Sequence, residues 1–213
     1  LSHELRTDLA VVATTSELLE ELGGLSARQL SQVKRIRASA MSMQRLVGAL
    51  LSLSRGGSAA QADSSALPLA AIARKAAGEL LPEAAGKGLS LVFSTAPGES
   101  PDVPEGLGFI VVSNLLRNAI RHTDSGEIAL EADSRGLSVR DTGCGIPPDE
   151  LQRIFAPFFR GRGAQGRGMG IGLSLVERIC RREGWTISVR SEPGRGTRFR
   201  LDVRADGEGR RAA

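Results

Sequence analysis

The apolar positions at the start of the chain follow the period of an amphipathic helix. Leu5, Leu9, Val12, Ser16 and Leu19 are separated by 4, 3, 4 and 3 residues, which places them on one face of a helix. The remaining positions are mostly polar. The pattern therefore predicts a helix that buries one side and leaves the other in water.

A second helix is predicted directly after the first. Gly23 and Gly24 end the first helix near residue 22. Ser26 and Gln29 form a capping box that opens the next helix. The apolar seam of this second helix has heptad spacing and consists of Val33, Ile36, Ala40, Met43, Val47 and Leu50. Two helices joined by so short a loop form an antiparallel hairpin.

A hairpin of about 50 residues buries too little apolar surface to be stable alone. We therefore expect it to pair with a second copy in a four-helix bundle, so that the intact protein is a homodimer. The alternative is that the hairpin packs only on the rest of its own chain.

The pattern changes after residues 55–65, which are rich in Gly, Ser and Ala and are typical of a linker. The helices predicted beyond it cover residues 69–81, 104–122 (with Pro104 at the first helical position) and 171–182. The predicted strands cover residues 89–93, 126–133, 136–141, 187–190 and 197–201. This mixture predicts an α+β layer with helices on one face of a mixed sheet.

The predicted elements divide the chain into four parts. We expect a helical hairpin over residues 1–56, a linker over 57–66, an α+β domain over 67–204 and a flexible tail over 205–213. The chain begins without Met and already inside a helical pattern, so we expect it to be part of a longer protein. No apolar run approaches the length of about 20 residues that a membrane span needs.

Composition narrows the classes of function. The 213 residues have 41% hydrophobic and 24% charged residues, which is ordinary for a globular protein. The chain has six Phe, one Trp and no Tyr, so stacking of nucleic-acid bases on aromatic side chains is a poor candidate for its function. Lys and Arg are interspersed with Asp and Glu, also in the Arg-rich segment near the C-terminus. We therefore expect no nucleic-acid partner. Cys144 and Cys180 lack the spacing of a zinc site or a disulfide framework, which fits a reducing cytoplasm.

His3 lies on the polar side of the first helix, roughly opposite the apolar stripe, and Thr7 shares that exposed side. Glu4 follows His3 directly. A neutral imidazole is a nucleophile near neutral pH, and a neighbouring carboxylate can orient it and accept its proton. The segment indicates an activated histidine, with a purely structural histidine as the alternative.

The helix predicted to end at residue 122 carries polar residues on one face. Asn114 and Asn118 are four residues apart, and Arg121 and His122 lie in the next turn. Amide oxygens can bind a hard cation, and a positive charge can bind phosphate. An accidental surface pair of asparagines is the alternative.

Residues 141–147, Asp-Thr-Gly-Cys-Gly-Ile-Pro, follow a predicted strand. Leu137, Val139 and Asp141 alternate onto one face, so the carboxylate continues an apolar row into the interior. A buried carboxylate needs hydrogen-bond donors, and the exocyclic amine of a purine would supply one. Gly143 and Gly145 allow the backbone to approach a ligand closely. The alternative is a tight turn that Asp141 caps.

A second glycine segment, residues 166–172, runs into a helix and has glycine at alternate positions. Backbone amides beside a helix N-terminus form an anion site. The segment lacks the Lys-Ser/Thr of a P-loop and the spacing of a dinucleotide fingerprint. Between the two glycine segments, the apolar residues 154–160 and the polar residues 161–167 indicate a hinge and a mobile lid over a ligand.

These segments together resemble the catalytic core of the sensor histidine kinases of two-component systems. Residues 3–7 resemble the phosphoacceptor box and residues 114–123 the Asn box. Residues 141–147 and 166–173 resemble the two glycine boxes, and residues 154–160 the Phe box between them. Order and spacing agree from Leu1 to about Leu201, so the five motifs are specific when taken together.

The resemblance implies a dimerising hairpin followed by a Bergerat-type α/β sandwich that binds ATP, as in DNA gyrase and heat-shock chaperones. It implies that His3 accepts the γ-phosphoryl group with Glu4 as general base, and that the group passes to an Asp in the receiver domain of a response regulator. Thr7 stands where related kinases orient water for dephosphorylation of that regulator. It also implies a cytoplasmic domain in a protein anchored in the inner membrane.

The resemblance implies a set of nucleotide contacts as well. Asn118 would hold Mg²⁺ with Asn114 beside it, and Asp141 would bind the adenine amine. The other implied contacts to ATP are Arg121, His122, Gly143, Gly145, Ile146, Arg160, Gly168, Gly170, Gly172 and Leu173.

Three positions depart from the family pattern. Asp8 replaces the proline that usually follows the threonine, and His122 and Phe159 stand where tyrosines are common. Because Asp8 imposes no proline ring, we expect the first helix to continue straight past His3. Two other functions stay open: a dimer module that binds nucleotide without turnover or is biased to phosphatase activity, and a gyrase-like or chaperone-like ATPase, which gives no reason for the His-Glu hairpin.

Overall fold

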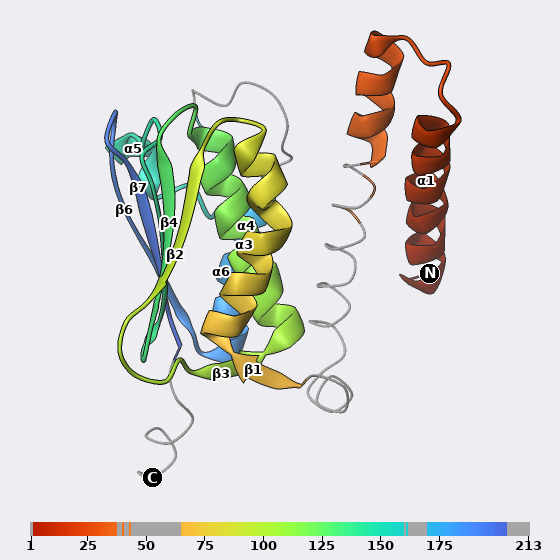
Figure 1. Ribbon diagram of the computed structural model, residues 1–213. Coiled ribbons are helices and arrows are strands. Elements are labelled where there is room, and N and C mark those ends of the chain that lie inside the picture. Colours follow the sequence, from red (N-terminus) through yellow and green to blue (C-terminus); the bar gives the residue numbers. More distant parts are fainter. Residues whose placement is uncertain are drawn as a thin grey trace. The chain divides into compact units, whose positions relative to one another are not determined.

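A computed structural model describes residues 2–37, 40, 43, 65–159, 161 and 170–203 of the chain, with the backbone alone over residues 2–7. The chain divides into two compact units, Leu1–Asp63 and Ser64–Ala213 (Figure 1). Most of the predicted linker, the seam positions Val47 and Leu50, and the predicted tail lie outside the described residues.

The first unit contains the predicted helical hairpin. Helix α1 (Ser2–Leu22) ends at Gly23 and Gly24, whose left-handed φ angles are 71° and 77°. The chain is helical again over residues 27–37. The capping box is present: the Ser26 N–H donates to Gln29 Oε1 at 3.0 Å, and the Gln29 N–H donates to Ser26 Oγ at 3.4 Å. Helix α1 continues through Asp8 without a break, as the sequence predicted.

The buried side of α1 is rotated from the predicted stripe. Ser16 is buried and donates to the Val12 carbonyl at 2.7 Å, while Leu9, Ala13 and Glu20 are half-buried. Arg37, on the second helix, forms ion pairs with Glu17 and Glu20. Most of the large apolar side chains of α1 are exposed instead, namely Val11, Val12, Leu18, Leu19 and Leu22. The described hairpin thus keeps a broad apolar surface.

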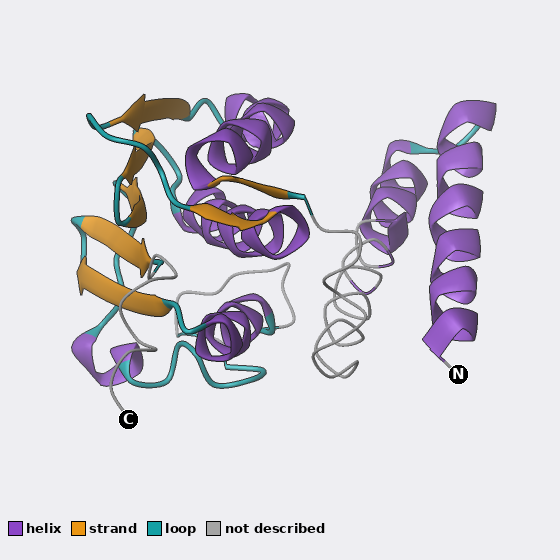
Figure 2. Cartoon of the chain, turned by 90° about the horizontal axis from the view of Figure 1, so that it is seen from below, coloured by secondary structure: helices purple, strands orange, loops and turns teal. Residues whose placement is uncertain are grey.

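The second unit is the predicted α+β layer (Figures 1 and 2). Its helices are α3 (Leu69–Ala85), α4 (Glu105–His122), α5 (Pro148–Leu151) and α6 (Gly172–Glu183). Its strands are β1 (Ala66–Pro68), β2 (Ser90–Thr95), β3 (Asp102–Pro104), β4 (Glu127–Asp133), β5 (Gly136–Asp141), β6 (Thr186–Glu192) and β7 (Gly196–Asp202). The main sheet has the order β2-β4-β5-β7-β6, and β1 pairs with β3.

The sheet is mixed, and three helices cover one of its faces. Strands β2 and β4 are parallel, and α4 lies in the crossover between them, while the other pairs are antiparallel. Helices α3, α4 and α6 pack on the same face (Figure 1). The largest fully buried side chains there include Leu69, Ile72, Leu115, Leu116, Ile120, Ile128, Leu130, Leu137, Ile179, Phe199 and Leu201. The predicted α+β class is confirmed.

Three local details differ from the sequence predictions. Pro104 is not the first helical residue but the last residue of β3, with α4 beginning at Glu105, because β3 pairs with the unpredicted strand β1. Helix α3 continues past residue 81 through Pro82 to Ala85, since Leu80 and Ala84 on either side of the proline are buried in the core. The short helix α5 was not predicted.

Ion pairs cross the face of the sheet away from the helices. Arg200 on β7 binds Asp133 on β4 through two hydrogen bonds of 2.7 and 2.8 Å. These hydrogen bonds lower the pKa of Asp133 to about 2. Arg198 similarly binds Glu131 at 2.8 Å. The charged side chains therefore connect strands that are not sheet neighbours.

The Asp133→Asn variant is expected to be less stable than the parent chain at pH 7, by about 0.5–1 kcal/mol, as for a well-oriented surface ion pair. A lowered pKa contributes stability above the unfolded value of about 3.9, and this contribution is lost as pH falls toward 2. Urea unfolding at several pH values should show the difference shrinking below pH 4. Glu99→Gln, at an exposed acid, is the control; a difference independent of pH would contradict the ion-pair explanation.

Candidate functional site

The C-terminal half of α4 brings the predicted polar residues to the rim of the helical layer. Its apolar side faces the core, so Asn114 and Asn118 are half-buried at the edge. The Asn114 amide donates to the Ile110 carbonyl at 2.8 Å, which leaves its Oδ1 toward the start of α6. A Cβ on Gly172 would lie 2.8 Å from this Oδ1. Glycine at 172 therefore allows α6 to begin close to Asn114.

The amide oxygens of this helix are the ligands available to a cation. Among the described residues, the Asn118 side chain has no hydrogen-bond partner, and no three His, Cys, Asp or Glu side chains gather into a metal site. Mg²⁺ retains several waters and is bound by few protein oxygens together with phosphate. The amide oxygen of Asn118, which accepts no hydrogen bond from the described residues, is chemically suited to such a metal.

Asp141 ends β5 and is only 5% exposed. Its Oδ1 accepts the Gly143 N–H at 2.9 Å and the Thr197 N–H at 3.2 Å. No donor from the described part of the chain binds its Oδ2. Burial raises the pKa of Asp141, and the two amide hydrogen bonds oppose that rise. The carboxylate therefore both caps the turn and keeps one oxygen for another donor.

The loop after β5 packs against the end of α4. The Cys144 N–H donates to the His122 carbonyl at 3.1 Å. A Cβ on Gly143 would overlap this carbonyl oxygen and would lie 2.9 Å from Asp141 Oδ1. Glycine at 143 is therefore required for the close approach. The contact joins the Asn-box helix to the first glycine segment.

The same loop also rests on the β6–β7 hairpin. The Ile146 N–H donates to Ser191 Oγ at 2.8 Å, and the Gly194 N–H donates to the Cys144 carbonyl at 2.8 Å. Gly145 has a left-handed φ of 69°, and a Cβ on it would overlap the Glu192 carbonyl oxygen. The loop is thus held from two sides.

The sequence analysis missed the contribution of this hairpin. Thr197 binds Asp141 from a distance of 56 residues along the chain, and Ser191 bonds both the loop and Thr197 Oγ1, the latter at 2.9 Å. Gly196, with φ of 100°, leaves room for the Asp141 carbonyl. A third glycine segment, residues 194–197 (Gly-Arg-Gly-Thr), lies in the turn between these two strands. This segment could have indicated that the hairpin approaches another part of the backbone closely.

The Phe-box segment contacts the second glycine segment. The Phe158 N–H donates to the Gly170 carbonyl at 2.9 Å, and both residues have left-handed φ angles, 64° and 68°. Ile154 is buried, whereas Phe158 is 73% exposed. Leu173 is half-buried in the first turn of α6. The predicted contacts Arg160 and Gly168, and most of the predicted lid, lie outside the described residues.

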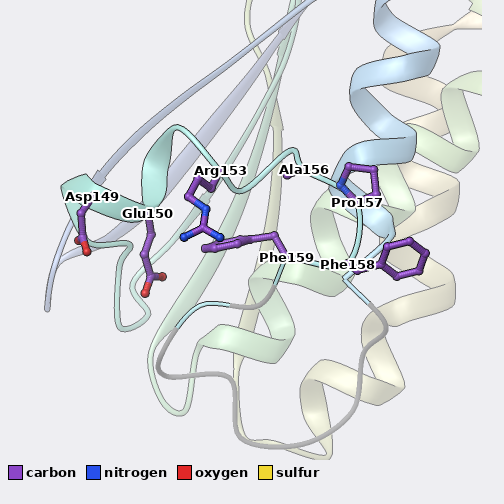
Figure 3. Close-up of a pocket in the computed structure, with 7 residues that line it drawn as sticks. All are labelled: Asp149, Glu150, Arg153, Ala156, Pro157, Phe158 and Phe159. Atoms are coloured by element: carbon purple, nitrogen blue, oxygen red, sulfur yellow. The ribbon is translucent and has the colours of Figure 1, made fainter.

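A cavity of about 470 Å³ lies beside this segment (Figure 3). Its lining residues are Asp149, Glu150, Arg153, Ala156, Pro157, Phe158 and Phe159. Arg153 lies over the Phe159 ring, 4.8 Å from its centroid, and Phe158 points away from this pair. The cavity contains none of the residues predicted to bind nucleotide.

His122 and Arg121 end α4 at the same rim. Burial lowers the pKa of His122, and the charges of Arg121 and Lys87 lower it further, while Asp124 acts in the opposite direction. His122 is therefore neutral at physiological pH and can donate or accept a hydrogen bond. Arg121 is exposed.

The structure brings together the end of α4, the loop after β5 and the start of α6. His3, Glu4 and Thr7 belong to the other unit. Their backbone is helical, and their side chains lie outside the described residues.

Two protein families match the chain. Residues 1–59 match the His Kinase A (phospho-acceptor) domain. Residues 104–207 match the histidine kinase-, DNA gyrase B-, and HSP90-like ATPase. The first match covers most of the helical unit, and the second covers the α+β unit from the end of β3 onward.

Two of the proteins with similar sequences are bacterial sensor proteins. The sensor histidine kinase RcsC of Salmonella typhimurium is 44% identical over 116 residues, which are 48% of this chain and 12% of RcsC. The phosphate regulon sensor protein PhoR of Pseudomonas aeruginosa is 31% identical over 209 residues, 93% of this chain and 47% of PhoR. This chain therefore spans less than half the length of either relative.

A solved structure shares the architecture. The crystal structure of full-length ShkA in complex with AMPPNP has a TM-score of 0.68 and 32% identity, and it covers 95% of this chain and 44% of ShkA. With a phosphoacceptor match over residues 1–59, an ATPase match over residues 104–207 and a sensor protein that is 31% identical over 93% of this chain, the chain belongs to the sensor histidine kinases of bacterial two-component systems.

Proposed function

We propose that the chain is an ATP-dependent protein-histidine kinase that phosphorylates its own His3. The phosphoryl group then passes to an Asp in the receiver domain of a response regulator, and the protein also dephosphorylates that regulator. The family matches support the kinase reaction. The observation that carries the proposal is the Asp141 carboxylate, which is buried beside the end of α4 with one oxygen left for a ligand.

Asp141 binds the adenine amine through Oδ2 in this proposal. The Gly143 and Thr197 amides hold Oδ1, so the carboxylate cannot turn away from the ligand. Gly145 and Ile146 lie in the loop that is fixed on the β6–β7 hairpin, and they form the wall beside the base. This part of the site would then be ordered before the nucleotide binds, which would reduce the ordering cost of binding.

The phosphates lie along the rim of α4 and the start of α6. Arg121 and His122 contact phosphate oxygens, and Asn118 binds Mg²⁺ with Asn114 beside it, since both amide oxygens lack donors from the described residues. When bound, Mg²⁺ neutralises phosphate charge. The remaining proposed phosphate contacts are Arg160, Gly168, Gly170, Gly172 and Leu173, of which the first two lie outside the described residues.

The reaction moves one phosphoryl group. A ring nitrogen of His3 forms a bond to the γ-phosphorus, the bond from that phosphorus to the bridging oxygen breaks, and ADP leaves. Glu4 accepts the imidazole proton. The receiver Asp then forms a bond to the phosphorus as the P–N bond breaks and the imidazole regains a proton. Thr7 orients the water that later attacks the aspartyl phosphate, so that its P–O bond breaks and inorganic phosphate leaves. Positioning and charge neutralisation supply most of the catalysis.

Incubation with γ-labelled ATP and Mg²⁺ tests the reaction. Label on the protein that is labile in acid and stable in base is the expected result for phosphohistidine. Free labelled phosphate with an unlabelled protein would instead indicate a gyrase-like or chaperone-like ATPase. Nucleotide binding without either product would indicate a non-catalytic module. Added receiver domain should accept the label.

We also propose that two copies of the hairpin form a four-helix bundle. The exposed apolar residues Val11, Leu18 and Leu22 follow one another at helical spacings of 7 and 4, and Val12 and Leu19 lie beside them. A second copy would cover this surface. The proposed parts of the chain are the hairpin over residues 1–56, the linker over 57–66 and the ATP-binding domain over 67–204.

The Leu18→Glu variant is expected to weaken the dimer at least tenfold, because it places a charge in the apolar seam. Leu81→Glu is a matched control, since Leu81 is 50% exposed on α3 and Leu18 is 52% exposed on α1. Sedimentation velocity over a range of concentrations measures both. Equal effects of the two substitutions would argue against this seam.

No helix in the described part of the chain is long and apolar enough to cross a membrane. We propose a cytoplasmic location for this portion, with the longer protein anchored in the inner membrane. Membrane fractionation of the full-length protein would test the anchor.

A further inference from the structure

Lys87 lies in the turn between α3 and β2 and reaches the end of α4. Its Nζ donates to three main-chain carbonyls: to Ile120 at 2.8 Å, Arg121 at 3.3 Å and Thr123 at 3.0 Å. The last carbonyls of a helix have no partners within the helix. A cation at this end is also favoured by the helix dipole. One side chain therefore caps the turn that carries Arg121 and His122.

The other carbonyls at this end have partners too. The Thr123 hydroxyl donates to the Ala119 carbonyl at 2.8 Å, and the Cys144 N–H donates to the His122 carbonyl at 3.1 Å. Lys87 and Cys144 thus hold the same helical turn from two sides. A shift of this turn would displace both the proposed phosphate contacts and the loop beside Asp141.

We propose that Lys87 is a positioning residue for the nucleotide site, which fixes the end of α4 against the first glycine segment. This inference rests on the proposed ATP-binding function. Lys87 acts through α4 and the Cys144 hydrogen bond, and it lies 33 residues or more from the segments that it holds.

The pKa of His122 reports the position and charge of Lys87 independently of ATP binding. Desolvation, Arg121 and Lys87 lower the pKa of His122, and Asp124, whose Oδ1 lies 4.0 Å from Lys87 Nζ, raises it. Loss of the Lys87 charge should therefore raise this pKa. The chain has two histidines, so a His3→Gln variant assigns the two imidazole signals in NMR.

The test compares Lys87→Met, which keeps an unbranched stem without charge or donors, with Lys87→Arg, which keeps both. Lys75→Met is the control, because Lys75 also contacts α4 but at its first residue, through an ion pair of 2.9 Å with Glu105. The measurements are ATP affinity by calorimetry, the His122 pKa by NMR, and the melting temperature without nucleotide.

Lys87→Met is expected to weaken ATP binding about tenfold and to raise the His122 pKa, and Lys87→Arg should restore most of the affinity. Lys75→Met should change neither. ATP affinity within twofold of the parent chain for Lys87→Met would overturn the proposal. Equal losses in both methionine variants would also overturn it, because they would reflect stability alone.

The measurements also distinguish an error in the proposed ATP-binding function from an error in the role of Lys87. If the parent chain binds no ATP, the nucleotide site itself is wrong. Amide hydrogen exchange over residues 118–123 and the His122 pKa still report whether Lys87 fixes this turn. An unchanged exchange rate and an unchanged pKa in Lys87→Met would contradict the capping role on their own.

Discussion

The Asp141→Asn variant is expected to lose ATP binding while the domain stays folded. The amide oxygen of Asn can accept the Gly143 and Thr197 N–H groups as Oδ1 does now. Its NH₂ group then replaces Oδ2, and a donor would face the donor of the adenine amine. Loss of a charge-assisted hydrogen bond in a buried site costs about 1.5–3 kcal/mol, which corresponds to an affinity loss of about 10- to 150-fold.

The stability of the domain without nucleotide should not fall in Asp141→Asn, and it should rise slightly. Because burial raises the pKa of Asp141, its charged form is disfavoured in the folded state, and this destabilising contribution grows as pH rises through that pKa. A neutral amide removes the contribution. Without nucleotide, the variant should therefore melt at the same temperature as the parent chain or slightly higher at pH 7.

Thermal unfolding with and without ATP measures both effects. ATP at a concentration a few times the parent Kd should raise the melting temperature of the parent chain and raise that of Asp141→Asn much less. Asp102→Asn, at an exposed position of β3, should respond to ATP as the parent chain does. Undiminished stabilisation of Asp141→Asn by ATP would show that Oδ2 does not bind the base.

Gly145→Ala is expected to have the second large effect, on both stability and ATP binding. Gly145 has φ of 69°, which costs a residue with a side chain about 1–2 kcal/mol. A Cβ there would also overlap the Glu192 carbonyl oxygen, and relief of a backbone clash costs about 1–3 kcal/mol more. The loop would have to leave the β6–β7 hairpin, which would displace Ile146.

The Gly194→Ala variant separates the cost of the left-handed backbone from the cost of the clash with Glu192. Gly194 has a similar φ of 77° in the same region, but no atom lies within 4 Å of an added Cβ. We expect Gly145→Ala to melt about 3–10 °C below Gly194→Ala, and to bind ATP at least tenfold more weakly. Similar melting temperatures and affinities in the two variants would show that the left-handed backbone, and not the Glu192 contact, is what glycine provides at 145.

Much of the secondary structure follows from short-range patterns. Helix α1 ends at Gly23 and Gly24, and the Ser26–Gln29 box opens the next helix, because caps act within one helical turn. The alternation of Leu137, Val139 and Asp141 placed the carboxylate on the buried face of β5, where the structure has it. Glycine at 143 and 145 likewise indicated a close approach of the backbone.

Only the tertiary structure decided what those residues approach. A Cβ added at Gly143 or Gly145 would meet the ends of α4 and β6, contacts that the sequence did not indicate. Thr197 completes the Asp141 contacts because β7 pairs with β5. Strands of three residues such as β1 and β3 carry too few positions for a period to show, so Pro104 was assigned to the helix.

The sequence by itself determined the division into a helical and an α+β part, the helices α3, α4 and α6, the strands of the main sheet and the positions of the polar motifs, since each depends on residues within a few positions of one another. The tertiary structure decided which side of α1 is buried, how the β6–β7 hairpin supports the first glycine segment and how Lys87 reaches α4. These contacts join residues that are far apart in the sequence, and their formation depends on which elements become neighbours when the core packs.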